Sequence, residues 1–180
     1  MNQPNNDTWV VFCTGASIKG RIEELKEHFN GWSNSICVNN AVRDFDSTYW
    51  AMLDSHPYEA NPNARDRKII TSCANYERVL RADPNLQIYE KCGETTSNSG
   101  SFGVIYAISK GAKKVITCGL DLDEDWKYYD DADNSHQNLA YTRFVNKEFH
   151  RFLNFNGCRV LSVNKNNTLG LDFYDTQQRS

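Results

Sequence analysis

The sequence lacks long hydrophobic runs, a leader segment and repeats. No apolar stretch in its 180 residues approaches the roughly 18 residues that a membrane-spanning helix needs. No basic-then-apolar leader opens the chain, and no internal repeat or low-complexity segment is evident. We therefore expect a cytoplasmic protein without a membrane span.

The chain also lacks an excess of one charge and closely spaced cysteines. Its formal net charge of -3 predicts no broad surface for nucleic acid and favours small-molecule partners. The six cysteines are scattered and include no C-x-x-C pair, so they predict buried thiols of a reducing compartment, not disulfides or a zinc site. With 39% hydrophobic residues, a chain of this length can bury one sizeable core.

Short β-branched or aromatic runs alternate with helical patterns, which predicts an α/β fold with a mostly parallel sheet and helices on both faces. The first unit is the apolar run WVVFC at 9–13, a loop, and a helical pattern in which Ile22, Leu25 and Phe29 share one face. Further strands are predicted at 35–40, 49–54, 68–72, 86–90, 113–119 and 158–163. Helices are predicted at 76–80, from about Ser99 to a left-handed C-cap at Gly111, and at 139–155.

Other segments carry more specific expectations. The stretch SHPYEANPNARDR at 55–67 holds two of the four prolines and predicts a loop or lid over the crevice. The polar tail at about 165–180 is expected to be ordered only in part, with 1–8 as a second flexible tail. Phe102, Ile105 and Ile108 form one helical face, and the apolar face of the last helix is predicted to consist of Tyr141, Phe144, Phe149 and Phe152.

Three short motifs also occur in short-chain dehydrogenases: TGAS at 14–17, VNNA at 38–41, and the Tyr-x-x-x-Lys pattern of Tyr106 and Lys110. Tyr106 and Lys110 share a helical face, as a catalytic tyrosine and a lysine that lowers its pKa would. That family's pyrophosphate loop needs several glycines, however, and TGASIKGR has only Gly15 and Gly20. A half-buried tyrosine and a solvated lysine near a helix C-terminus is the simpler interpretation.

Polar and small residues follow several predicted strands. Asn39, Asn40 and Asp54 come at carboxyl ends, where parallel strands face a binding crevice. Ser99 and Gly100 open a predicted helix, whose free N–H groups and dipole can hold a phosphate; a simple N-cap is the alternative. The run DLDED, which begins at Asp121, could chelate Mg²⁺ beside a nucleotide diphosphate, and a solvated acidic loop is the commoner explanation.

Six pieces of the sequence occur in the order and spacing of one superfamily. They are CTGAS at 13–17, CVNNA with Asn39, AMLD with Asp54, NSG at 98–100, SKGAKKVITCG at 109–119 and GLD at 119–121. From about Trp9 to Val163 the chain resembles the bacterial lipooligosaccharide sialyltransferases and the related 6-hydroxymethyl-dihydropterin pyrophosphokinases of the MptE type. The resemblance implies a single Rossmann-like, nucleotide-binding domain over 1–180.

The resemblance also implies roles for individual residues. In the sialyltransferases the first glycine-rich loop and the Ser-Gly turn flank the donor's cytidine monophosphate, and a strand-end asparagine contacts nucleotide or sugar. The donor-binding residues it implies are Thr14, Gly15, Ser17, Asn39, Ser99 and Gly100, with Asp54 and Asp121 lining the crevice. Cys13 stands where the pattern usually has glycine. His136 lies in the region that carries the sialyltransferases' catalytic histidine and is the candidate general base; a loop histidine without a catalytic role is the alternative.

These implications lead to a glycosyltransferase-like enzyme that moves a sugar from a donor of the CMP-sialic acid type to an unidentified acceptor. The expected partner is a nucleotide or nucleotide sugar, no cofactor or metal site is expected, and a homo-oligomer stays open. One alternative is a pyrophosphokinase that uses Mg²⁺ and ATP to modify a pterin. The others are a non-catalytic nucleotide- or sugar-binding module and a short-chain dehydrogenase.

Overall fold

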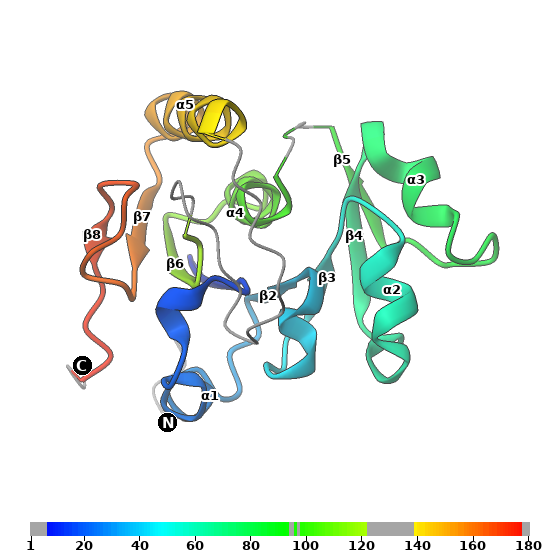
Figure 1. Ribbon diagram of the computed structural model, residues 1–180, viewed down its shortest axis with the longest axis horizontal. Helices are drawn as coiled ribbons and strands as arrows, with labels where there is room; N and C mark the ends of the chain where they lie inside the picture. Colours follow the sequence, from blue (N-terminus) through cyan, green and yellow to red (C-terminus); the bar gives the residue numbers. More distant parts are fainter. Residues whose placement is uncertain (1–6, 94–95, 97, 122–138, 178–180) are drawn as a thin grey trace.

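Eight parallel strands form one sheet in the described part of the chain (Figure 1). The structure is a computed structural model and describes residues 7–93, 96, 98–121 and 139–177. The strands are β1 (Thr8–Phe12), β2 (Ser35–Val38), β3 (Tyr49–Ala51), β4 (Lys68–Ser72), β5 (Glu90–Cys92), β6 (Lys114–Cys118), β7 (Arg159–Ser162) and β8 (Asp172–Phe173). The α-helices are α1 (Ile22–His28), α2 (His56–Ala60), α3 (Tyr76–Leu80), α4 (Ser99–Ser109) and α5 (Leu139–Asn156). The short 3-10 helices are η1 (Ala16–Ile18), η2 (Asn39–Arg43), η3 (Pro62–Ala64) and η4 (Cys73–Asn75).

The strand order reverses next to β1. Across the sheet the order is β5-β4-β3-β2-β1-β6-β7-β8, and Val10 of β1 lies opposite Ser35 of β2 on one side and Ile116 of β6 on the other. The chain therefore builds outward from β1 to β5 and then returns to the other side of β1. In open α/β sheets, ligands bind at the carboxyl ends of the strands where the order reverses. Here that point lies between β1 and β6.

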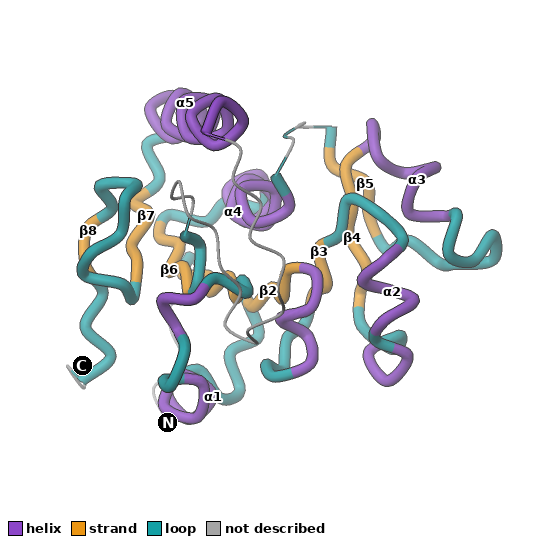
Figure 2. The backbone as a smooth tube through the Cα atoms, in the orientation of Figure 1, coloured by secondary structure: helices purple, strands orange, loops and turns teal. Residues whose placement is uncertain are grey.

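Helices cover both faces of the sheet (Figures 1 and 2). α4 and α5 pack over a core that includes Val11 and Val115. α1, α2 and α3 pack over a second core, which includes Val10 and Ile116. Neighbouring residues of β1 and β6 thus point into different cores, as strand geometry requires. The arrangement is Rossmann-like, and the predicted α/β fold with helices on both faces is confirmed.

Most predicted elements are confirmed at nearly their predicted ranges. β4 and α3 match, β1 lies within one residue of its prediction, and Gly111 has the expected positive φ of 88°. β5 differs: it is formed by Glu90–Cys92, because Leu86 and Ile88 of the predicted strand instead pack on the second core. α4 also differs from a one-faced helix, since all of its residues from Gly100 to Ile108 are buried.

The segment 55–67, predicted to be a loop or lid, is a helical connection between β3 and β4. It contains α2 and η3. Tyr58 is buried and stacks on Trp50, with ring centres 6.1 Å apart. The buried Asn61 donates hydrogen bonds to the Pro57 carbonyl at 2.7 Å and to Asn40 at 2.8 Å. Because these side chains hold the segment on the protein body, the lid interpretation is wrong.

α5 buries a different set of residues from the predicted one. Val145 and Phe149 are buried and Phe152 is partly buried, whereas Phe144 is 54% exposed. Tyr141 lies among the side chains that the structure does not describe. The sequence pattern placed Phe144 on the buried face, but the structure buries its neighbour Val145 instead. An aromatic residue adds to a hydrophobic pattern even when its side chain is exposed.

The tail from 165 to 177 is part of the fold, contrary to the expectation of partial order. β8 pairs in parallel with β7, and Leu169 is 1% exposed. The Arg21 guanidinium donates hydrogen bonds to the Val163 carbonyl at 2.8 Å and to the Thr176 hydroxyl at 3.1 Å. The tail therefore owes its order to partners far away in sequence, which a polar composition does not reveal. Of the predicted N-terminal tail, residues 1–6 lie outside the described part.

Candidate functional site

The loops after β1 and β6 are joined directly at the point where the strand order reverses. The Cys13 N–H donates to the Cys118 carbonyl at 2.7 Å, and the Gly15 N–H donates to the Gly119 carbonyl at 2.9 Å. These bonds continue the β1–β6 pairing beyond the strand ends. They hold the TGAS loop, including Thr14, at the carboxyl edge of the sheet.

Asp121 fastens the first loop a second time. Its carboxylate accepts a hydrogen bond from the Ser17 N–H at 2.7 Å and another from the Ser17 hydroxyl at 2.5 Å. Ser17 lies in η1, which follows the loop. Two of the predicted site residues are therefore in direct contact, and the contact fixes the loop whether or not either residue touches a ligand.

Glycine is needed where the two loops meet. A Cβ on Gly15 would lie 2.5 Å from both the Asp121 carboxylate and the Gly119 carbonyl, much closer than real Cβ atoms approach other atoms. Gly119 itself has a φ of 72°, in the left-handed region that side chains disfavour. The two glycines thus allow the close approach of the β1 and β6 loops.

The N-terminus of α4 abuts the same two loops. Asn98 is the N-cap, and its side chain accepts a hydrogen bond from the Ser101 N–H at 3.0 Å. Within the described residues, the N–H groups of Ser99 and Gly100 have no acceptor. A Cβ on Gly100 would lie 2.6 Å from Leu120 and 3.3 Å from the Cys13 sulfur. Gly100 is therefore required for packing, a role that the sequence interpretation as a phosphate contact did not include.

Asn39 lies at the end of β2, next to β1, in an unusual backbone conformation. Its φ is 49°, the only positive φ among described residues other than glycine. Asparagine tolerates this region better than most residues do. The Asn39 carbonyl accepts a hydrogen bond from the Trp50 indole at 2.8 Å, while its buried side-chain oxygen has no donor in the described part of the chain.

Asp54 lies at the same edge but further from the reversal point. β3 is two strands from β1, about 10 Å at the usual strand spacing. The Asp54 carboxylate accepts a hydrogen bond from the His56 N–H at 3.2 Å, so it helps begin α2. No described contact joins Asp54 or Asn39 to the β1 and β6 loops. His136 lies outside the described residues, as do residues 122–125 of the acidic run.

Tyr106 and Lys110 form a structural cluster with Glu90 instead of a dehydrogenase pair. The Tyr106 hydroxyl donates to the Glu90 carboxylate at 2.8 Å, and the Lys110 ammonium donates to it at 2.5 Å. Burial, followed by this hydrogen bond, raises the pKa of Tyr106, whereas a dehydrogenase tyrosine needs a lowered pKa. Tyr106 also packs on Trp9 and Tyr49. Both residues lie near the amino ends of their strands, whereas the crevice is at the carboxyl ends. These contacts give Tyr106 and Lys110 a structural role, so their Tyr-x-x-x-Lys spacing does not indicate a dehydrogenase site here.

The cysteines mostly match the expectation of buried thiols. Four of them are buried, namely Cys13, Cys37, Cys92 and Cys118, while Cys73 is exposed and Cys158 is half-buried. Burial raises the pKa of Cys37 to about 12, and it raises the pKa of the buried thiols Cys13 and Cys118 as well. These three thiols are therefore protonated and inert at neutral pH. Within the described residues, no group of three or more His, Cys, Asp or Glu could hold a metal ion.

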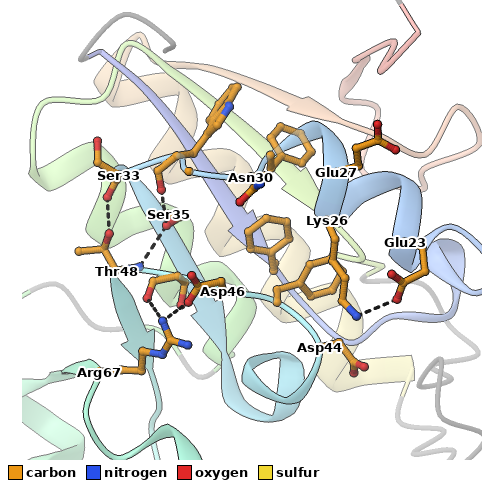
Figure 3. A pocket seen from close by; sticks show the side chains of 16 residues that line it. Glu23, Lys26, Glu27, Asn30, Ser33, Ser35, Asp44, Asp46, Thr48 and Arg67 are labelled. Atoms are coloured by element: carbon orange, nitrogen blue, oxygen red, sulfur yellow. Dashed lines mark hydrogen bonds and ion pairs between the residues drawn. The ribbon is translucent and has the colours of Figure 1, made fainter. Parts of the chain in front are cut away.

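A cavity of about 810 Å³ lies elsewhere, beside the loops that precede β2 and β3 (Figure 3). Its charged side chains include two ion pairs, Lys26 with Glu23 at 2.8 Å and Arg67 with Asp46. The Thr48 hydroxyl donates to the Ser33 carbonyl at 2.6 Å and connects the two loops. Since these loops lie at the amino ends of the strands, this cavity is separate from the predicted site.

Sequence reasoning missed two features of the site. Asn98 was noticed only as part of NSG, although an asparagine directly before a helical pattern is a recognisable N-cap signal. The residues after β7 and β8 border the same edge of the sheet through Ser17. No sequence signal marked them, because their position follows from strand order alone.

Comparisons with known proteins show no family for this chain. No protein-family model matches the sequence, and no curated protein matches it. Among solved structures, the chain is similar to a UDP-glucose 4-epimerase from Thermotoga maritima, which was solved with UDP-glucose. The identity is 16%, the TM-score is 0.36, and the match covers 86% of this chain and 54% of the epimerase, so this chain spans about half of its length. No helix of the described residues combines the length and apolarity needed to cross a membrane.

Proposed function

We propose that this protein binds a nucleotide sugar where the strand order reverses, between β1 and β6, and transfers the sugar to an acceptor. One observation carries the proposal. The N-terminus of an 11-residue helix meets the two fastened strand-end loops and leaves the Ser99 and Gly100 N–H groups without an acceptor in the described residues. Such a helix terminus attracts a phosphate through its N–H groups and its dipole.

The chemistry of transfer follows from this arrangement. When the bond between sugar and phosphate breaks, negative charge grows on the departing phosphate. Two N–H groups fixed in place stabilise that charge without having to reorient. The Ser17–Asp121 contact keeps the β1 loop rigid beside them. In this proposal Thr14 and Asn39 contact the nucleotide or sugar, and Asp54 lies at the far end of the crevice.

The acceptor hydroxyl must lose a proton during transfer, and we propose His136 as the base that takes it. This role rests on the resemblance to the sialyltransferases. A His136→Ala variant should lower kcat by about a hundredfold or more and leave donor affinity little changed. Unchanged kcat would remove His136 from the mechanism.

A thermal-shift series with CMP, UDP, ATP with Mg²⁺, and NAD tests the proposal and its alternatives. At a hundred times its dissociation constant, a ligand should stabilise the protein by about 2.7 kcal/mol, which raises Tm by roughly 5–10 °C. Stabilisation by CMP or UDP supports a nucleotide-sugar site. Stabilisation by ATP only with Mg²⁺ favours the pyrophosphokinase, and stabilisation by NAD favours the dehydrogenase. If no nucleotide raises Tm, the proposal is wrong.

A further inference from the structure

A cavity of about 320 Å³ opens at the same carboxyl edge as the proposed donor site. Ser17 borders both, because it lines the cavity and also bonds to Asp121. The other walls come from α1, from residues that follow β7, such as Asn164 and Lys165, and from the segment around and after β8. A cavity of this size suits a small ligand. A molecule bound there would lie next to the donor.

The walls are held together by Arg21. Its guanidinium donates to the Val163 carbonyl at 2.8 Å, to Glu24 at 2.8 and 3.0 Å, and to the Thr176 hydroxyl at 3.1 Å. These contacts join α1, the end of β7 and the C-terminal segment, which runs beside α1 (Figure 1). Because these bonds use four of its five N–H donors, Arg21 serves mainly to shape the cavity.

Other groups in the lining have few hydrogen-bond partners among the described residues. The Lys165 ammonium lies 4.9 Å from the centre of the Phe173 ring, and no carboxylate of the described residues pairs with it. In the same part of the chain, the Asp175 carboxylate accepts only the Gln177 N–H, at 2.9 Å. Phe173 is 37% exposed. The cavity therefore offers an aromatic ring, a hydrogen-bond donor and an acceptor.

This combination matches a sugar ring better than a phosphate. The positive charges of Arg21 and Lys165 are balanced by Glu24 and Asp175, so the lining carries no net charge to attract an anion. A pyranose has an apolar C–H face that can pack on an aromatic ring. Its hydroxyls can donate to a carboxylate and accept from an ammonium or amide group.

We infer that this cavity binds a neutral pyranose and serves as the acceptor subsite, with Phe173 as the packing surface and Asp175 and Lys165 as hydrogen-bond partners. The acceptor role rests on the proposed function. Sugar binding itself does not, because it can be measured without a donor.

The test is an NMR titration of the full ¹⁵N-labelled chain with methyl glycosides of galactose, glucose, mannose and N-acetylglucosamine. At least one should give saturable amide shifts at Asn164, Lys165 and residues 173–177. Asp175→Asn, Lys165→Ala and Phe173→Ala should each weaken that binding about tenfold, the loss expected for one charge-assisted hydrogen bond or one packing surface.

Matched controls keep the test specific. Asp172→Asn changes an exposed carboxylate of the same segment that pairs with Arg159. Lys68→Ala removes another lysine that lies 4.9 Å from an aromatic ring, that of Tyr89. Both controls should bind the glycoside as the unchanged protein does. An unaltered Tm shows that the cavity variants are folded.

The outcomes separate the two proposals. If no glycoside shifts these amides while a nucleotide still binds, the acceptor inference is wrong and the proposed function stands. Equal affinity in Asp175→Asn, Phe173→Ala and the unchanged protein also overturns the inference. If a glycoside binds at the cavity but no nucleotide binds to the protein, the sugar site is supported and the proposed transferase function is wrong.

Discussion

The Asp121 carboxylate accepts two hydrogen bonds from Ser17, at 2.7 and 2.5 Å, although the two residues are 104 positions apart. This contact gives a stability role to an aspartate that the sequence analysis assigned to the crevice. Whether Asp121 also contacts a ligand is a separate question, and variants distinguish the two roles.

Asp121→Ala should destabilise the protein by about 1–3 kcal/mol, because the Ser17 N–H loses a charged acceptor in a partly buried place. Asp121→Asn should cost less, since an amide can accept from the N–H and donate to the hydroxyl. Urea unfolding measures both. Asp172→Ala is the control: its ion pair with Arg159 is exposed, so its loss should cost no more than about 1 kcal/mol. Equal stability of Asp121→Ala and the control would contradict the role.

Gly100→Val should destabilise the fold, in contrast to a substitution that only blocks a phosphate. Even a Cβ at this position would lie 2.6 Å from Leu120, which is buried. Overpacking of this kind costs about 1–3 kcal/mol. The variant's Tm in the absence of ligand checks the prediction. An unaltered Tm would show that the helix terminus has room to move.

Ser99→Pro tests the phosphate site more cleanly. Ser99 is the first residue of α4, where proline is favoured, and Asn98 before it has φ −120° and ψ 126°, which suits a residue that precedes proline. The change should preserve Tm while deleting one N–H. Nucleotide affinity should fall about tenfold or more by calorimetry, and Ser99→Ala, which keeps the N–H, should bind normally. Full affinity in Ser99→Pro would reject the phosphate role.

Tyr106→Phe should leave nucleotide affinity unchanged and cost about 1 kcal/mol of stability, the usual net value of one hydrogen bond. The reason is that Tyr106 donates to Glu90 at a distance from the crevice. Chemical unfolding of this variant measures its stability, and a nucleotide titration measures its affinity. Loss of nucleotide-dependent activity with stability intact would revive the dehydrogenase interpretation.

Stability should fall in acid through Glu24. Hydrogen bonds from Arg21 and Thr176 hold the pKa of Glu24 at about 2, below its ordinary value of 4.5. A lowered pKa in the folded state stabilises the protein above pH 4.5, and this contribution is lost as the pH falls toward 2. Glu24→Gln should therefore be less stable at pH 7, by no more than about 1 kcal/mol for so exposed a pair. The difference in stability between Glu24→Gln and the unchanged protein should close near pH 2.

Local patterns predicted the frame of the site, and distant contacts determined its details. The strand at 8–12 and the start of α4 were predictable because hydrophobic runs and helix-start signals depend on adjacent residues. The Ser17–Asp121 contact and the packing of Gly100 against Leu120 were not, because they depend on which strands become neighbours. The tail after 164 was misjudged for the same reason, since its order comes from Arg21.

The central place of β1 also determines how the chain folds. Thr8 to Phe12 pair with Lys114 to Cys118, so β1 gains this neighbour only after the whole segment between the two strands has been made. Parallel pairing over such a separation closes a long loop and slows folding. A chain truncated before β6 would leave β1 as an apolar edge strand, the kind of surface that leads to aggregation. Expression of nested C-terminal truncations should therefore give insoluble products until β6 is included.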